Sequence, residues 1–150
     1  MREAEIKHGR LAMLAAVGWP LAELFDKPIA QQLGLPSLLT SSGESPSVLN
    51  GGLENIDIFY WISVISLTGA IEIEIMKVKD KEGKNYVVGD VGFDPLGFLP
   101  KEKQAKFEMQ TKEIKHGRIA MMAILGFVVQ EILYGKPVVA ETPFFFQPLF

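Results

Sequence analysis

The chain has no cysteine and only two histidines among its 150 residues. The absence of cysteine excludes a disulfide framework, a thiolate zinc site and a cysteine nucleophile. The formal net charge is only -3, and no stretch interleaves aromatic residues with lysine or arginine, so nucleic acid is not an expected partner. Hydrophobic residues make up 48% of the chain, which excludes a disordered tail.

Long uncharged hydrophobic runs are also missing, since none reaches the roughly 18 residues that announce a membrane span. Three apolar segments nevertheless extend to spanning length if a few charges are admitted. They predict an all-α membrane protein of one domain, residues 1–150, whose three helices lie near 3–26, 56–77 and 108–134. A soluble helical bundle with one basic loop is the alternative.

Basic residues are absent from residues 28–55, whereas ten of the 15 lysines and arginines lie between Lys77 and Arg118. Alternation of basic and non-basic connections is typical of helices that cross a membrane in turn, with the basic connections on one side. The N-terminus and the 77–118 connection are therefore expected on the same side of the membrane.

Local signals mark the expected helix ends. Asn55 and Asp57 are candidate caps for the second helix, and Gly135 followed by Lys136-Pro137 is typical of a helix end. Pro20 should kink the first helix or end it early. The last residues, 144–150, predict a short apolar tail at the membrane interface.

An internal repeat links the first and third helices: Glu5-Ile-Lys-His-Gly-Arg-Leu-Ala-Met13 recurs as Glu113-Ile-Lys-His-Gly-Arg-Ile-Ala-Met121. Eleven of nineteen positions are identical between residues 5–23 and 113–131. The two helices are therefore copies of one unit.

The repeat predicts two ion pairs between its copies. On a helix, Glu5 and His8 lie on nearly the same side, whereas Arg10 lies roughly 140° around the axis from Glu5. A two-fold axis would bring Glu5 to Arg118 and Glu113 to Arg10, which neutralises charges that hydrocarbon would otherwise penalise. Small residues would let the crossing backbones approach, namely Gly9, Ala12, Ala16, Gly117 and Ala120.

Glutamate oxygens and histidine nitrogens left over after this pairing could ligate Mg²⁺, Mn²⁺ or iron. The simpler interpretation of the glutamates is a plain salt bridge, and that of the histidines is a hydrogen bond within the helix. The methionines at 13, 121 and 122 are expected to pack against neighbouring side chains rather than to bind a metal. A di-iron carboxylate enzyme also uses two Glu-x-x-His helices, but it needs four converging helices and leaves the two arginines unexplained.

At these residues the sequence resembles the chlorophyll-binding light-harvesting complex family, whose signature Glu-x-x-(His/Asn)-x-Arg-x-Ala-Met stands at 5–13 and again at 113–121. Further matches occur at 69–72, 92–97 and 126–130. Residues 18–23 and 46–52 are similar to the red-lineage branch, of the fucoxanthin chlorophyll a/c-binding type.

The resemblance implies a thylakoid antenna in the plastid that passes excitation to a photosystem and makes no bonds, with a photoprotective, energy-dissipating member as the alternative. It implies chlorophyll a with chlorophyll c, xanthophylls, and as partners a photosystem core, neighbouring antenna subunits and thylakoid lipids. Arg10 and Arg118 would close the ion pairs, and Asp94 would lie near a carotenoid. The implied ligands of chlorophyll magnesium are Glu5, His8, Glu72, Glu113, His116 and Gln130.

Two departures from the family pattern leave expectations open. The family often has a basic residue shortly after the glutamate of the second helix, whereas Glu72 is followed by Ile73, Glu74 and Ile75, so either Glu72 or Glu74 could be the ligand. The chain also starts almost at the first helix, without the transit peptide and loop expected there, which suggests a partial chain.

Overall fold

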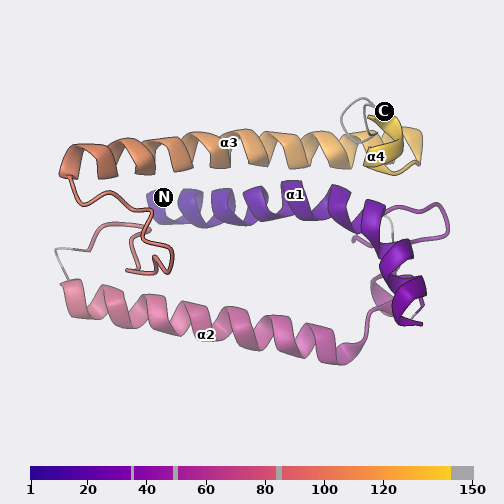
Figure 1. Cartoon of the computed structure of the whole chain (residues 1–150), viewed down its shortest axis with the longest axis horizontal. Helices are drawn as coiled ribbons and strands as arrows, with labels where there is room; N and C mark the ends of the chain where they lie inside the picture. The colour runs from indigo at the N-terminus through magenta and orange to yellow at the C-terminus, as the bar shows by residue number, and fades with distance from the viewer. Residues whose placement is uncertain (35, 49–50, 84–85, 143–150) are drawn as a thin grey trace.

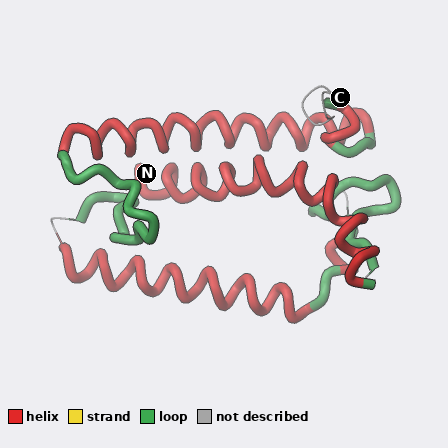
Figure 2. Tube along the Cα trace, viewed as in Figure 1, coloured by secondary structure: helices red, strands yellow, loops and turns green. Residues whose placement is uncertain are grey.

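The computed structural model describes residues 1–34, 36–48, 51–83 and 86–142. Within these ranges it contains helices and loops and no extended strand (Figure 2). The all-helical prediction is thus confirmed for this part of the chain, and the apolar tail predicted at 144–150 lies outside it. The elements are α1 Arg2–Leu33, a 3₁₀ turn Leu53–Asn55, α2 Ile58–Glu82, α3 Lys103–Tyr134 and the short α4 Val138–Glu141.

The first helix is longer than predicted. It continues through Pro20 and Pro28 and ends at Gly34, whose left-handed conformation (φ 67°) closes it. Pro20 therefore does not end the helix, and its C-terminal part bends away from α3 (Figure 1). Neighbouring turns carry the helix past each proline at the cost of one backbone hydrogen bond.

The other helix ends follow local chemistry more than hydropathy. The carboxylate of Asp57 accepts a hydrogen bond from the backbone N–H of Phe59 at 2.7 Å and caps α2, as predicted. Both α2 and α3 extend further into the 77–118 connection than the predicted bounds of 77 and 108. Their added turns are rich in lysine, a good helix former that a search for apolar residues ignores.

Two helices, α2 and α3, are long and apolar enough to cross a membrane. In the described part of the chain α1 does not meet this criterion, because charges and prolines interrupt its apolar stretch. The structure thus supports two spanning helices and leaves the predicted third span as a proposal.

The helices α1 and α3 form a close pair, and α2 lies apart from them. Figure 1 shows α1 and α3 side by side and running in the same direction, with α2 antiparallel and apart from them. The N-terminus lies at the same end as the α2–α3 connection, while the α1–α2 connection and α4 lie at the other end (Figure 1). This partition is the one that the lysine distribution predicts.

Equivalent positions of the repeat meet each other along the α1–α3 contact. A Cβ atom on Gly117 would lie 2.9 Å from the Cα atom of Gly9, and one on Gly9 would lie 3.1 Å from Gly117. Further along, the rings of Trp19 and Phe127 meet edge to face at 6.4 Å. Because residues that touch their own counterparts lie on a two-fold axis, α1 and α3 are a pseudo-two-fold pair, as predicted.

An ion pair joins the α2–α3 connection to α3, and its contribution to stability should depend on pH. The Lys106 ammonium donates to Asp90 at 2.5 Å and holds the pKa of that carboxyl below its ordinary value of 3.8. A lowered folded-state pKa means that this contribution is complete above about pH 3.8 and is lost as the pH falls through the folded-state pKa.

We therefore expect Asp90→Asn to lower the free energy of unfolding by about 1 kcal/mol at neutral pH, and by progressively less below pH 3.8. Thermal melts followed by circular dichroism in detergent micelles measure the difference. Asp80→Asn is the matched control, because Asp80 is exposed and pairs with none of the described residues. A penalty for Asp90→Asn that stayed constant down to pH 2 would contradict the assignment.

Candidate functional site

The crossing of α1 and α3 contains two reciprocal ion pairs. Arg10 Nε donates to Glu113 Oε1 at 2.6 Å, and Arg118 Nε donates to Glu5 Oε1 at 2.6 Å. These are the crossed partners that the helical angle predicts, and each glutamate is neutralised by the opposite copy of the repeat. Glu5 and Glu113 are each about one-third exposed, at 34% and 33% of the side chain.

The two ion pairs differ in their surroundings. Arg10 also donates from Nη2 to the backbone carbonyl of Gly89 at 2.7 Å, so it ties the α2–α3 connection to the crossing. Arg118 bonds only Glu5 among the described residues, and 63% of its side chain is exposed, against 40% for Arg10. The pseudo-two-fold symmetry therefore holds for the two ion pairs but not for the contacts around them, since only Arg10 is bonded to the α2–α3 connection in the part of the chain that the structure describes.

Pairing leaves each glutamate with one spare oxygen. Within the described ranges, Oε2 of Glu5 and Oε2 of Glu113 accept no hydrogen bond. A carboxylate neutralised through one oxygen can offer the other to a cation or a metal centre without carrying net charge into an apolar setting.

Both histidines are held in one tautomer. His8 Nδ1 lies 2.7 Å from the carbonyl oxygen of Ala4, and His116 Nδ1 lies 2.9 Å from that of Lys112. Because a carbonyl can only accept, Nδ1 carries a proton, and in the neutral imidazole Nε2 keeps its lone pair. Both side chains are exposed, so each presents a metal-ligating nitrogen outside the helix pair.

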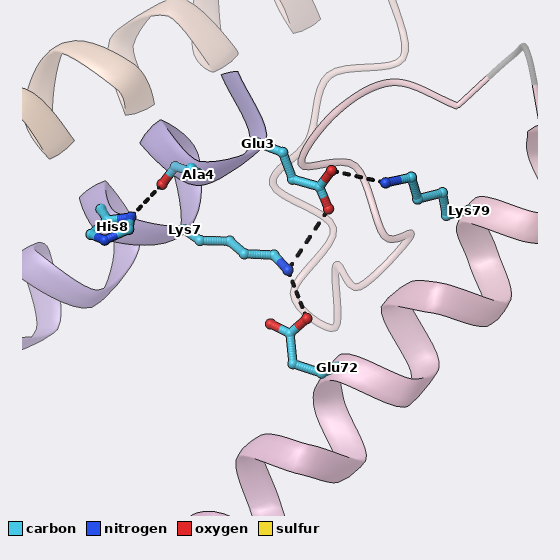
Figure 3. Close-up of polar contacts among 6 residues, drawn as sticks. All are labelled: Glu3, Ala4, Lys7, His8, Glu72 and Lys79. Atoms are coloured by element: carbon cyan, nitrogen blue, oxygen red, sulfur yellow. Dashed lines mark hydrogen bonds and ion pairs between the residues drawn. The ribbon is translucent and has the colours of Figure 1, made fainter. Parts of the chain in front are cut away.

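The second helix carries two glutamates with different partners. Glu72 Oε2 accepts from Lys7 of α1 at 2.6 Å, whereas Glu74 Oε1 accepts from Lys77 of its own helix at 2.6 Å (Figure 3 for the first pair). In the described part of the chain, Oε1 of Glu72 has no hydrogen-bond partner. Glu72 thus has the same arrangement as Glu5 and Glu113.

Gln130 lies on α3 at one side of a shallow apolar groove of about 560 Å³. Its amide makes no hydrogen bond to the described residues, so its oxygen is available to a ligand. The groove is lined by Met122, Ala123, Leu125, Gly126, Phe127, Val129 and Gln130.

Asp94 fixes the turn that precedes α3. Its Oδ1 accepts from Phe98 N at 3.0 Å and its Oδ2 accepts from Leu99 N at 2.8 Å. The observed task of this side chain is therefore to shape its own loop, and its predicted place beside a carotenoid is left untested.

The described part of the chain does not assemble the donor set of a di-iron centre. Among the described residues, no group of three or more histidine, aspartate and glutamate side chains lies close enough together to hold one metal ion. Glu5 and Glu113 instead each face an arginine.

Sequence reasoning missed three contributors. The contact of Lys7 with Glu72 is not predicted, and Glu23 and Glu131, the last residues of the two repeated stretches, are given no role by the sequence. Glu23 accepts from the backbone N–H of Val139 at 3.0 Å, and Glu131 accepts from Trp19 Nε1 at 2.8 Å. Their identity in both copies was the available signal, and it marks the junction of α1, α3 and α4.

Together these features define a class of protein: a helical, apolar chain in which repeated helices carry neutralised glutamates and exposed histidines, each able to supply one ligand atom. The chain matches the chlorophyll A-B binding protein family over residues 1–132 and belongs to that family.

Three relatives illustrate the similarity. The chain is 35% identical over 150 residues to a chloroplastic fucoxanthin-chlorophyll a-c binding protein of Isochrysis galbana, with 90% of this chain and 64% of the relative covered. It is 32% identical over 143 residues to such a protein of Chattonella marina var. antiqua, covering 92% and 59%. It is 33% identical over 141 residues to the light-harvesting complex stress-related protein 3.2 of Chlamydomonas reinhardtii, covering 88% and 52%. The chain thus spans about half to two-thirds of these relatives.

Proposed function

We propose that this protein is a light-harvesting antenna subunit that binds chlorophyll and carotenoid and transfers excitation energy without chemical reaction. The observation that carries the proposal is the pair of exposed histidines, each with Nδ1 held by a carbonyl, at equivalent positions of two packed helices. Such a neutral nitrogen from His8 or His116 would hold the magnesium of a chlorophyll.

The other proposed ligands fit the same requirement. Glu5, Glu113 and Glu72 each have one oxygen paired with a cation of another helix and one oxygen free of the described residues. Gln130, one of the residues that line the shallow apolar groove of α3, offers a neutral amide oxygen. None of these donors would bring uncompensated charge to a pigment.

The separation of α2 supports a pigment-filled interior. This helix makes no close backbone contact with α1, α3 or α4, and none of its residues is buried. Protein alone therefore leaves its apolar surface uncovered, and flat apolar pigments would cover it. The exposed side chains include Ile58, Phe59, Tyr60, Ile62, Ile65, Leu67, Ile71, Ile73 and Met76.

In this function the protein acts by holding pigments at fixed positions. Chlorophyll supplies light absorption when bound. The rigid α1–α3 crossing fixes where each ligand atom lies, the ion pairs keep the ligands neutral, and the surrounding side chains tune each environment. Similarity to the fucoxanthin-chlorophyll a-c binding proteins supports chlorophyll a, chlorophyll c and fucoxanthin-type xanthophylls as pigments.

The same proposal extends to the setting of the protein. The relatives are chloroplastic, and two apolar helices fit the thylakoid membrane. With its glutamates paired, α1 would be the third span, and the basic connection would face the stroma. A photosystem core, neighbouring antenna subunits and thylakoid lipids are the proposed partners, and Asp94 is proposed to lie near a xanthophyll ring.

Refolding the chain with extracted thylakoid pigments tests the proposal. We expect His116→Leu and Gln130→Leu each to lose about one chlorophyll per chain, because each removes one donor atom. His116→Asn should retain the pigment, since the amide oxygen replaces Nε2, and Gln110→Leu on the same helix is the matched control for Gln130. Unchanged chlorophyll content in His116→Leu would refute this ligand, and a wild-type chain that binds no pigment would refute the function.

Similarity to a stress-related light-harvesting protein supports an energy-dissipating member as the second candidate. The fluorescence lifetime of the pigment-loaded protein separates the two functions. A long lifetime at neutral and acidic pH supports harvesting, whereas marked shortening supports dissipation.

A further inference from the structure

The second helix is attached to the first by charge. Lys7 of α1 bonds Glu72 of α2 at 2.6 Å, and Lys79 of α2 bonds Glu3 of α1 at 3.0 Å. Lys7 also lies 3.7 Å from Glu3, so the four side chains form a chain of alternating charge, Lys79–Glu3–Lys7–Glu72. Figure 3 shows Lys7 reaching from α1 between the two carboxylates.

This network belongs to one copy of the repeat only. The position equivalent to Glu3 in the second copy is Thr111, whose hydroxyl donates to the carbonyl of Phe107 in its own helix. The position equivalent to Lys7 is Lys115, which is exposed and makes no ion pair within the described residues. Glu3 is thus an addition to the repeated unit, whereas the lysine is common to both copies and makes an ion pair with α2 from the first copy only, among the described residues.

Glu72 needs a counter-ion from another helix, whereas Glu74 does not. Glu74 is already paired within α2, three residues from Lys77, and 69% of its side chain is exposed. No basic residue lies three or four positions before or after Glu72 in α2, so its counter-charge has to come from another element. A carboxylate amid apolar surface is costly without such a partner.

We propose that Lys7 is the positioning residue of the second helix: it neutralises Glu72 across the gap, makes Glu72 rather than Glu74 the pigment ligand, and sets the α1–α2 spacing. The inference rests on the proposed chlorophyll-binding function for its pigment part. Its spacing part depends on the protein alone.

The pigment part is tested by refolding with extracted thylakoid pigments. Lys7→Met removes the charge and keeps the length of the side chain. We expect it to lose about one chlorophyll per chain, with the same absorption difference spectrum as Glu72→Leu. Lys115→Met is the matched control from the equivalent position and should keep the full pigment content, and Lys7→Arg should restore the chlorophyll by restoring the charge.

A second-site variant separates counter-charge from general damage to the fold. Glu72→Gln supplies an uncharged amide oxygen that needs no counter-ion, so Lys7→Met combined with Glu72→Gln should regain the chlorophyll that Lys7→Met loses. Full pigment content in Lys7→Met alone would overturn the proposal. Loss of the α2 pigment in Glu74→Leu, with none in Glu72→Leu, would overturn it as well.

The spacing part is measured on the pigment-free protein in detergent micelles. The chain has no cysteine, so spin labels at Ala4→Cys and Met76→Cys report a single distance between α1 and α2. Lys7→Met should broaden that distance distribution, whereas Lys115→Met should leave it unchanged. An unchanged distribution in Lys7→Met would overturn the spacing role, while a wild-type chain that bound no pigment would refute the proposed function and leave this result standing.

Discussion

Replacing Gly117 with leucine should prevent α1 and α3 from closing. The Cβ atom of any larger residue would lie 2.9 Å from the Cα atom of Gly9, and that neighbour is backbone, which can give way only if the helices separate. Because both ion pairs of the crossing depend on this approach, we expect a loss of about 3 kcal/mol or more in the free energy of unfolding. Pigment yield on refolding and thermal melting of the refolded protein measure the effect.

Two further variants test whether the close contact at Gly117 causes this loss of stability. Gly117→Ala places the same Cβ atom against Gly9 but adds no atoms beyond it, so it should lower the free energy of unfolding by less than leucine does. Gly18→Leu is the matched control within α1, since a Cβ atom there meets nothing within 4 Å. Wild-type pigment yield in Gly117→Leu would show that the glycine contact does not set the crossing.

The partners at the α1–α3 crossing could be predicted because they follow from helical geometry within each helix and from the exact repeat of the motif. Helical geometry alone separates Glu5 from Arg10 around the axis, and the exact second copy supplies Arg118 as the alternative partner. The same symmetry places Gly9 opposite Gly117. These conclusions require no knowledge of how far apart the helices lie.

The remaining features depend on tertiary distances that no periodicity encodes. The meeting of Lys7 with Glu72 depends on where the unrepeated α2 lies relative to α1, and the contact of Arg10 with Gly89 depends on the path of a loop. Helix ends were misplaced because charged turns such as those before Gly83 continue a helix beyond its apolar core. The bonds of Asp94 to Phe98 and Leu99 could not be predicted because they follow from loop conformation, and its expected place near a carotenoid stays a prediction.

The two arginines of the crossing should not be equally important, although the repeat makes them equivalent. Arg10→Leu leaves Glu113 without its counter-ion and Gly89 without its donor, so we expect it to cost about 3 kcal/mol in the free energy of unfolding of the pigment-loaded protein. Arg118→Leu should cost less, because the more exposed Arg118 bonds Glu5 alone among the described residues. Thermal melts of the two refolded variants make the comparison directly.

A second substitution separates the two tasks of Arg10. Adding Glu113→Gln to Arg10→Leu removes the unpaired charge, and it should recover stability in part while leaving the Gly89 carbonyl without its donor. Proteolysis of the α2–α3 connection, residues 83–102, should then stay faster than in wild type, whereas Arg118→Leu should leave it unchanged. Equal losses of stability in Arg10→Leu and Arg118→Leu would contradict this, because the Gly89 contact, made by Arg10 and not by Arg118, would then contribute nothing.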